Sequence, residues 1–188
     1  MNFTLESGVS GGVPLAVPDF GISDKPESMI RPDDMFMLFN GGGLDVSFLG
    51  FAQIDQKGKV NVSKFGNNFV GCGGFIDIAQ NTKKLIFCGC FNAKGLDVKI
   101  ENANLIIRSE GELKKFINNV DQITYNPKFA LSKKQILKII TERCVFEYKE
   151  GRLELTEIMQ GINLETQILS QIEFDIKVSS KLKVMRIQ

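Results

Sequence analysis

The sequence predicts an α/β domain with an open, mixed β-sheet. Residues 75–82 have the apolar spacing of a helix, and residues 85–91 follow as a continuous apolar run that is typical of a strand buried on both faces. The second half of the chain alternates and turns repeatedly, as antiparallel hairpins do. The chain has 188 residues, and we expect residues 1–188 to form one domain with its own core.

The residue pattern at the start of the chain predicts little regular secondary structure. Residues 1–24 predict a short strand that ends at Glu6, followed by a loop rich in glycine and proline. Residues 26–31 predict a short turn between two prolines, and residues 35–39 form a short apolar segment that ends at residues 40–43, Asn-Gly-Gly-Gly.

The middle of the chain predicts strands and one helix. Residues 44–55 are rich in Val, Phe and Ile and predict a strand, and residues 56–59 predict a hairpin turn before residues 60–66. The helix at residues 75–82 begins directly after three glycines. These elements give the predicted sheet its buried strands.

The second half predicts hairpins and a final helix. Residues 96–111 predict a hairpin, residues 116–126 add a strand, and residues 135–158 predict two strands around a Lys-Glu-Gly-Arg turn. Residues 163–174 predict a helix that has Asn163 as its N-cap.

Composition excludes several classes of function. The net charge is +1, from 23 basic and 22 acidic residues, so nothing in the charge balance favours nucleic acid or an anionic membrane as a partner. No apolar run approaches about 18 residues, so we expect no transmembrane helix. The N-terminus has no signal-peptide pattern, and a cytoplasmic protein is expected.

Residue types narrow the chemistry further. The chain has no histidine, which excludes Ser-His-Asp and Cys-His catalysis within it and leaves carboxylates, lysines, thiols, hydroxyls and backbone dipoles. The four cysteines predict buried, reduced thiols and no metal site. Cys88 and Cys90 form a Cys-x-Cys pair that could be half of a metal site, but no second pair has ligand spacing.

Three glycine clusters stand out, at residues 8–12, 41–43 and 71–74. Glycine lets backbone N–H groups approach a ligand or an oxyanion, although the same residues also serve simple tight turns. The clusters complete neither a Walker A loop nor a Gly-x-Gly-x-x-Gly fingerprint, so these phosphate-binding motifs are not supported.

Glu6 is the carboxylate of most interest. A single glutamate is most often a solvated surface charge. Glu6, however, ends a strand and precedes a loop without bulky side chains, and a carboxylate nucleophile is one of the few chemistries open to a chain without histidine.

On four stretches, the chain resembles the catalytic half of the family I CoA-transferases, most closely the short-chain acyl-CoA transferases of the acetate, propionate and acetoacetate type. These stretches are "ESGVSGGVP" (6–14), "FNGGGLDVSFLGFAQID" (39–55), "GKVNVSKFGNNFVGCGGFIDIAQNTKKLIFCG" (58–89) and "TERCVFEYKEGRLELTEIMQGINLETQIL" (141–169). The resemblance implies an open mixed sheet of the CoA-transferase, NagB/RpiA-like type.

The resemblance also implies a role for each matched position. Glu6 stands where the family has its nucleophilic glutamate, and Gly42 and Gly43 stand where backbone N–H groups stabilise an oxyanion. The glycines beside Glu6 are expected to leave room for an acyl group and then a pantetheine arm. The implied substrate-binding positions are Gly8, Asp45, which would brace its turn, and Gly71, Gly73, Gly74 and Phe75.

The implied reaction moves CoA from a short-chain acyl-CoA to a free carboxylic acid, with coenzyme A as substrate and no cofactor or metal. Such domains begin with a further strand–helix unit, so this chain is expected to be N-terminally incomplete. It is expected to act only with a complementary N-terminal half or subunit, in a homo- or hetero-oligomer. The alternatives are an inactive fragment or non-catalytic interaction module of the same fold, and a related acyl-CoA hydrolase.

Overall fold

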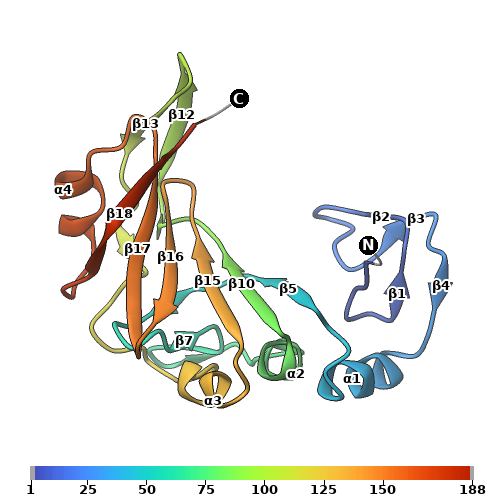
Figure 1. The fold of residues 1–188 in the computed structure, drawn as a ribbon. Helices are drawn as coiled ribbons and strands as arrows, with labels where there is room; N and C mark the ends of the chain where they lie inside the picture. The colour runs from blue at the N-terminus through green and yellow to red at the C-terminus, as the bar shows by residue number, and fades with distance from the viewer. Residues whose placement is uncertain (1–2, 187–188) are drawn as a thin grey trace.

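The computed structural model describes residues 3–186, apart from the side chains of residues 130 and 131. A six-stranded sheet forms its centre, in the order β18-β17-β16-β15-β10-β5 (Figure 1). The strands are β5 (Val46–Leu49), β10 (Lys84–Cys88), β15 (Ile136–Ile140), β16 (Cys144–Lys149), β17 (Arg152–Met159) and β18 (Lys177–Met185).

The sheet is mixed, which confirms the predicted fold class. Strand β10 pairs in parallel with both β5 and β15, whereas β15, β16 and β17 pair antiparallel, and β17 pairs in parallel with β18. The predicted hairpin around the Lys-Glu-Gly-Arg turn is the β16–β17 pair, but residues 135–158 form three strands instead of two, because the chain turns once more at residues 141–143.

Short strand pairs surround the sheet. They are β1 (Val9–Ser10) with β4 (Ser28–Met29), β2 (Val13–Pro14) with β3 (Ser23–Asp24), β6 (Gln53–Ile54) with β7 (Val60–Asn61), β8 (Lys64–Phe65) with β9 (Asn68–Phe69), β11 (Asn92–Ala93) with β14 (Leu113–Lys114), and β12 (Asp97–Glu101) with β13 (Asn104–Ser109). The β12–β13 pair confirms the predicted hairpin at residues 96–111.

The helices are short. They are α1 (Pro32–Asn40), α2 (Phe75–Asn81), α3 (Pro127–Ser132), α4 (Leu164–Gln167) and the single 3₁₀ turn η1 (Leu169–Gln171). Helix α2 confirms the prediction at residues 75–82, whereas α1 was not predicted. Within residues 3–186, no helix combines the length and the apolar character that crossing a membrane requires.

The predicted helix at residues 163–174 is too long. Asn163 caps α4 as predicted, since its side chain accepts a hydrogen bond from the Thr166 N–H at 2.9 Å. The α-helix stops after Gln167, because the carbonyl of Gln167 accepts a hydrogen bond from Arg143 at 2.8 Å and the Gln171 N–H donates to Ile168 instead.

Three strand predictions were wrong. Residues 44–55 are divided between β5 and β6, which belong to different sheets, and residues 116–126 form no strand but only isolated bridges, at Phe116 and Tyr125. Strand β10 is buried on one face, not both: Leu85 and Phe87 are inaccessible, whereas Cys88 is exposed. Residues 60–66, which follow the predicted hairpin turn, form β7 and β8.

The prediction that the four cysteines are buried is confirmed for one of them. Cys144 is buried, but Cys72 is half-buried, and Cys88 and Cys90 are exposed. A strand that is open on one face presents every second side chain to solvent, which the apolar run alone did not reveal.

The core lies between one face of the sheet and the segments that cross it. Its centre is aromatic: ring centroids are 4.8 Å apart for Phe91 and Phe116 and 5.0 Å apart for Phe116 and Phe146. Phe87 stacks on Phe75 of α2 at 5.6 Å. These contacts attach α2 and the 116–125 segment to the sheet.

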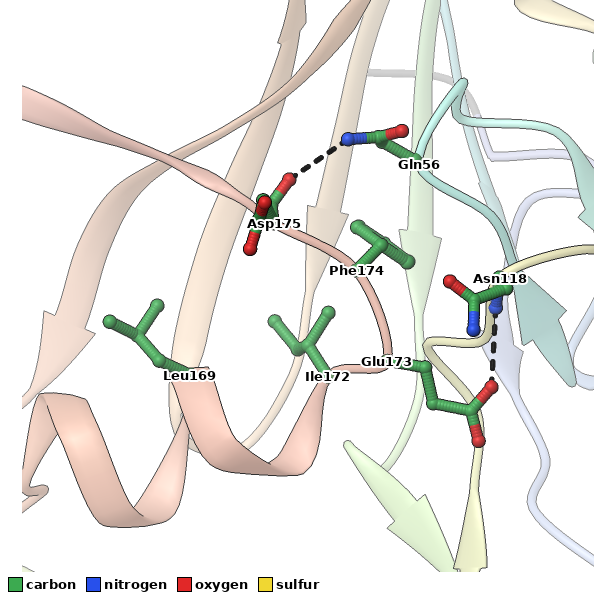
Figure 2. A pocket seen from close by; sticks show the side chains of 7 residues that line it. All are labelled: Gln56, Asn118, Leu169, Ile172, Glu173, Phe174 and Asp175. Atoms are coloured by element: carbon green, nitrogen blue, oxygen red, sulfur yellow. Dashed lines mark hydrogen bonds between the residues drawn. The ribbon is translucent and has the colours of Figure 1, made fainter.

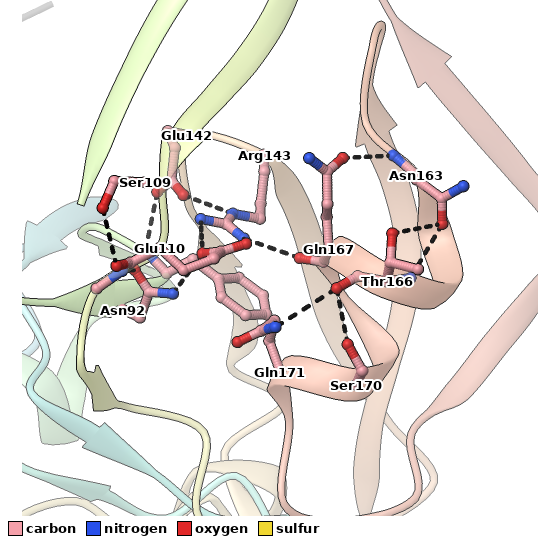
Figure 3. A network of polar contacts seen from close by, with 12 residues as sticks. Asn92, Ser109, Glu110, Glu142, Arg143, Asn163, Thr166, Gln167, Ser170 and Gln171 are labelled. Atoms are coloured by element: carbon pink, nitrogen blue, oxygen red, sulfur yellow. Dashed lines mark hydrogen bonds and ion pairs between the residues drawn. The ribbon is translucent and has the colours of Figure 1, made fainter.

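A buried arginine, Arg143, joins several segments in one polar network (Figure 3). Its side chain is fully buried and forms ion pairs with Glu110 at 2.8 Å and with Glu142 at 2.7 Å. The guanidinium also lies 4.6 Å from the centroid of the Phe91 ring. Asn92 donates a further hydrogen bond to Glu110 at 2.6 Å, so the loops after β10 and β13 and the end of α4 all meet at this arginine.

We expect Arg143→Met to destabilise the protein strongly. Removing one partner of a buried ion pair leaves uncompensated charge and costs about 3–5 kcal/mol. The free energy of unfolding, measured in urea, should fall by that amount. Arg152→Met, at an exposed arginine beside the β16–β17 turn, should change it by no more than about 0.5 kcal/mol. Equal effects of the two substitutions would contradict this role for Arg143.

Glu110→Gln should make the fold less sensitive to acid. Burial acts to raise the pKa of Glu110, but hydrogen bonds from Arg143 and Asn92 outweigh it and hold the pKa below its ordinary value of 4.5. A carboxyl group whose pKa is lowered by folding stabilises the fold fully above its unfolded pKa, and the contribution is lost as the pH falls through the folded value.

Urea unfolding at neutral pH and in steps below pH 4.5 tests this expectation. The loss of stability on acidification should be smaller for Glu110→Gln than for the unchanged chain. An identical loss in both would show that Glu110 does not contribute to acid unfolding.

Candidate functional site

Glu6 lies at the tip of a tight turn and not at the end of a strand as predicted, since the described residues before it form only an isolated bridge, between Thr4 and Ser10. The Leu5 N–H donates to the carbonyl of Val9 at 2.8 Å, and the Gly8 N–H donates to the carbonyl of Leu5 at 3.0 Å. Gly8 has a φ of +97°, which closes the turn at a conformation that favours glycine. The turn leaves the Glu6 side chain exposed.

This turn is part of a small N-terminal lobe, which we define as residues 3–30. The β1–β4 and β2–β3 pairs form its backbone, and Ser7 donates to the carbonyl of Gly21 at 2.6 Å. The Glu27 N–H donates to the carbonyl of Ser10 at 2.9 Å. The lobe therefore holds the Glu6 turn by its own hydrogen bonds.

The Glu6 carboxylate lies directly beside Gly74, the residue that precedes α2. A methyl group placed on Gly74 would lie 2.8 Å from Oε2 of Glu6 and 2.5 Å from the ring of Phe36. Such approaches are closer than real Cβ contacts, so only glycine fits here while Glu6 and Phe36 keep their positions. The site therefore consists of Glu6, Phe36 and Gly74, from three separate segments.

Sequence reasoning identified Glu6 and Gly74 but missed Phe36. Phe36 belongs to α1, whose helical character was not recognised in the short apolar segment at residues 35–39. The Pro at the first position of α1 and the two aspartates after it were the available signals for a helix start.

The loop before α2 is open. A methyl group on Gly71 or Gly73 would meet nothing within 4 Å, and their φ values are +85° and +51°. Gly71 also borders a largely apolar cavity of about 200 Å³. The residues that line this cavity are Ser63, Phe69, Gly71, Cys72, Ile76, Gln122, Ile123 and Thr124.

The structure does not bring Gly42 and Gly43 to Glu6. Their N–H groups donate to the carbonyls of Phe39 and Leu38, each at 3.0 Å, and so end α1. Gly42 lies beside Asn81, the last residue of α2, whereas Gly74 precedes the first. The length of α2 thus separates them from Glu6 by roughly 10 Å.

Asp45 also lies away from Glu6. Its carboxylate is exposed and pairs with Lys83 at 2.6 Å, beside the first residues of β5 and β10. The hydrogen bond from Lys83 lowers the pKa of Asp45 below its ordinary value. Asp45 thus braces the connection between the two strands.

Two further residues that were predicted to bind substrate, Phe75 and Gly8, are packed against other parts of the protein. Phe75 is buried against Phe87, in the core. A side chain on Gly8 would overlap the carbonyl of Ile30, so this glycine allows two backbone segments of the lobe to pack closely. The open space that was expected beside Glu6 is found at Gly71 and Gly73 instead.

A larger cavity of about 390 Å³ lies away from these residues (Figure 2). Its lining residues are Gln56, Asn118, Leu169, Ile172, Glu173, Phe174 and Asp175. Gln56 donates to the carbonyl of Asp175 at 3.1 Å across its rim. None of its lining residues was predicted as a site residue. In the part of the chain that the structure describes, no three acidic or thiol side chains gather closely enough to hold a metal ion.

Gly74→Ala should disturb the site directly, because the new methyl group overlaps both Glu6 and Phe36. Overpacking of this kind costs about 1–3 kcal/mol. Gly50→Ala is a matched control, since a methyl group on Gly50 meets nothing within 4 Å. Thermal and urea unfolding should show a loss for Gly74→Ala and almost none for Gly50→Ala; the reverse order would contradict the contact.

Comparison with known proteins identifies relatives over nearly the whole chain, although no protein-family model matches it. The caffeate CoA-transferase of Acetobacterium woodii is 43% identical over 190 residues, which cover 98% of this chain and 36% of that protein. The acetate CoA-transferase YdiF of Escherichia coli strain K12 is 41% identical over 182 residues, which cover 97% of this chain and 34% of that protein. The acetate CoA-transferase subunit beta of Haemophilus influenzae is 31% identical over 153 residues, which cover 81% of this chain and 58% of that subunit.

The fold agrees with these relatives. The crystal structure of the acyl-CoA transferase YdiF apoenzyme from Escherichia coli O157:H7 matches with a TM-score of 0.90 at 40% identity, over 97% of this chain and 34% of that chain. A thioester complex of the same enzyme with CoA matches equally well, with a TM-score of 0.90. The chain spans about a third of the length of the caffeate and acetate enzymes. By sequence and by fold, it belongs to the family I CoA-transferases.

Proposed function

We propose that this chain supplies the glutamate-bearing part of a CoA-transferase, with Glu6 as the covalent nucleophile. One observation carries the proposal: the exposed carboxylate of Glu6 lies beside Gly74, at the end of an open glycine loop. The identity of 43% and 41% with two CoA-transferases supports CoA transfer as the reaction class.

The reaction begins with ionised Glu6. A carboxylate oxygen of Glu6 attacks the acyl-CoA carbonyl, the C–S bond breaks, and an acyl-glutamyl anhydride and CoA thiolate result. The thiolate then attacks the glutamyl carbonyl, which releases the first acid as its carboxylate and leaves a glutamyl-CoA thioester. The thioester complex with CoA described for YdiF supports an intermediate of this kind.

The second half reverses these steps with a new acid. The incoming carboxylate attacks the glutamyl thioester and expels CoA thiolate, forming a second anhydride. The thiolate attacks the acyl carbonyl of that anhydride, so a new acyl-CoA leaves and Glu6 is restored as a carboxylate. Coenzyme A takes part as substrate, and the sequence balances without a further cofactor.

Each attack creates a tetrahedral oxyanion, which backbone N–H groups stabilise. We assign this role to the loop that ends at Gly74 and not to Gly42 and Gly43, whose N–H groups already donate within the turn after α1. No hydrogen bond within residues 3–186 uses the N–H of Gly74. Loss of one oxyanion donor typically lowers the rate by about 100- to 1,000-fold.

The substrates are an acyl-CoA and a free carboxylic acid, and the names of the relatives support acids as different as acetate and caffeate. Because the chain spans about a third of these proteins, we propose that it works with a complementary part of the enzyme. That part is either a separate subunit or a second section of one chain, and the assembly is an oligomer.

Acyl-CoA hydrolysis is the second candidate. The exposure of Glu6 favours it, because water reaches the glutamyl thioester as readily as an acid does when nothing covers the site. Release of CoA that does not increase when acetate is added would indicate hydrolysis. Release that is accompanied by a new acyl-CoA would indicate transfer.

The covalent role of Glu6 can be tested by trapping. The chain is combined with the part of the caffeate CoA-transferase that it does not match, then with butyryl-CoA and hydroxylamine. Hydroxylamine converts a glutamyl thioester into a hydroxamate, so mass spectrometry should find the modification on the peptide that contains Glu6. Glu6→Gln should abolish it.

Glu27→Gln is the matched control, because Glu27 is an exposed glutamate of the same lobe and lies close to Gly11. This variant should keep the hydroxamate on Glu6. Transfer that persists at full rate in Glu6→Gln would contradict the proposed nucleophile.

A further inference from the structure

One lysine, Lys115, is half-buried against an aromatic ring. Its Nζ lies 3.8 Å from the centroid of the Phe51 ring, and within residues 3–186 it forms neither an ion pair nor a hydrogen bond. Burial lowers the pKa of Lys115 below its ordinary value of 10.5, although the Cys90 thiol and the Glu142 carboxylate act to raise it. An ammonium group that has lost water without gaining a partner is costly, so this amine is suited to receive an anion.

The nearby carboxylate of Glu142 is already engaged elsewhere. It accepts a hydrogen bond from the side chain of Arg143 at 2.7 Å and another from the Phe91 N–H at 2.8 Å. Because Arg143 is fully buried, these contacts hold the Glu142 carboxylate in the polar network of Figure 3. Among the described residues, the charge of Lys115 therefore has no direct counterion.

Lys115 lies where two parallel strands, β5 and β10, stop pairing. The Lys84 N–H donates to the carbonyl of Asp45 at 3.0 Å, and a parallel ladder repeats this bond at every second residue. Continued past the strand ends, the ladder would join the Phe51 N–H to Cys88 and the Cys90 N–H to Phe51. Neither N–H group forms a hydrogen bond within the part of the chain that the structure describes. The strand ends thus leave two backbone donors unused.

The Lys115 amine lies beside these two donors. A methyl group on Gly89 would be 3.1 Å from the Lys115 Nζ and 3.1 Å from the Phe51 ring. Gly89 directly precedes Cys90, and alternation along the chain places a side chain at Gly89 on the same face of the sheet as Phe87. The amine therefore lies on the face that α2 covers, at the carboxyl ends of parallel strands, where open α/β sheets bind ligands.

The candidate site lies at the same edge of the sheet. Helix α2 runs back along β10, because its first residue, Phe75, stacks on Phe87 near the end of the strand. Gly74 precedes this helix and is the residue beside the Glu6 carboxylate. An anion held at Lys115 is thus on the same face and at the same edge as Glu6.

We propose that the gap between the ends of β5 and β10 binds a small carboxylate, with the Lys115 ammonium and the N–H groups of Phe51 and Cys90 as donors. One cation balances one carboxylate, whereas a phosphate dianion would bring a second negative charge toward Glu142. The Phe51 ring supplies an apolar wall for the rest of a short acid. This inference rests on the proposed function and identifies where the acid substrate is held on its way to and from Glu6.

Binding can be measured on the free chain by NMR titration of the ¹⁵N-labelled protein with acetate at constant ionic strength. The amide signals of Phe51 and Cys90 should shift and saturate at millimolar acetate. Lys115→Met should abolish these shifts. Lys115→Arg, which keeps the charge, should retain them, so a loss of folding in the methionine variant would not decide the outcome.

Lys114→Met is the matched control, because Lys114 is the adjacent lysine and is exposed on β14. This variant should show the same shifts as the unchanged chain. Absence of saturating shifts in the unchanged chain, or shifts that persist in Lys115→Met, would overturn the inference. Equal shifts with inorganic phosphate would indicate an adventitious ion only and would also overturn it.

Kinetics of the chain combined with the unmatched part of the caffeate CoA-transferase give a second readout. Lys115→Met should raise the KM for acetate about ten-fold, as expected for the loss of one charge-assisted hydrogen bond, and leave the KM for butyryl-CoA unchanged. Equal increases in both KM values would contradict a site for the acid.

The two experiments separate this inference from the proposed function. If acetate shifts the Phe51 and Cys90 amides but no hydroxamate forms on Glu6 with butyryl-CoA and hydroxylamine, the proposed function fails while the carboxylate site stands. If the hydroxamate forms but acetate produces no shift, the carboxylate site fails while the proposed function stands.

Discussion

The full burial of the Arg143 charge constrains how the segments around the central sheet are arranged. A buried guanidinium is stable only with anionic partners and satisfied hydrogen bonds. Glu110 and Glu142 supply the charge, and the carbonyl of Gln167 accepts a further bond. These partners come from distant parts of the sequence, so the network positions the loops after β10 and β13 and ends α4. The aromatic core packs beside it, through Phe91.

The candidate site, in contrast, is exposed and has little packing around it. Glu6 is exposed and lies in a lobe that has almost no buried side chains, and its position depends on the absence of one Cβ atom at Gly74. A well-packed sheet thus carries α2 and its glycine loop, while the nucleophile approaches from a weakly attached segment. This division is consistent with the proposal that a complementary part of the enzyme completes the active site.

Residue patterns predicted the features that depend on local chemistry. The α/β class, helix α2 and the Asn163 cap follow from apolar spacing and capping preferences, and the family resemblance pointed to Glu6 and Gly74. Features that depend on distant partners were missed. The early end of α4 requires Arg143, the exposure of Cys88 requires knowledge of which sheet face is covered, and the use of the Gly42 and Gly43 N–H groups requires α1, which the pattern did not reveal.

The most direct measurement is the transfer of an oxygen label from the acceptor acid to the carboxylate of Glu6. The chain and its complementary part are incubated with butyryl-CoA and acetate that carries ¹⁸O in its carboxylate, and the peptide that contains Glu6 is weighed by mass spectrometry. If an anhydride forms at Glu6, one labelled oxygen remains on its carboxylate when acetyl-CoA leaves. The account predicts ¹⁸O on Glu6 together with acetyl-CoA formation. Formation of acetyl-CoA with no label on Glu6 would contradict it.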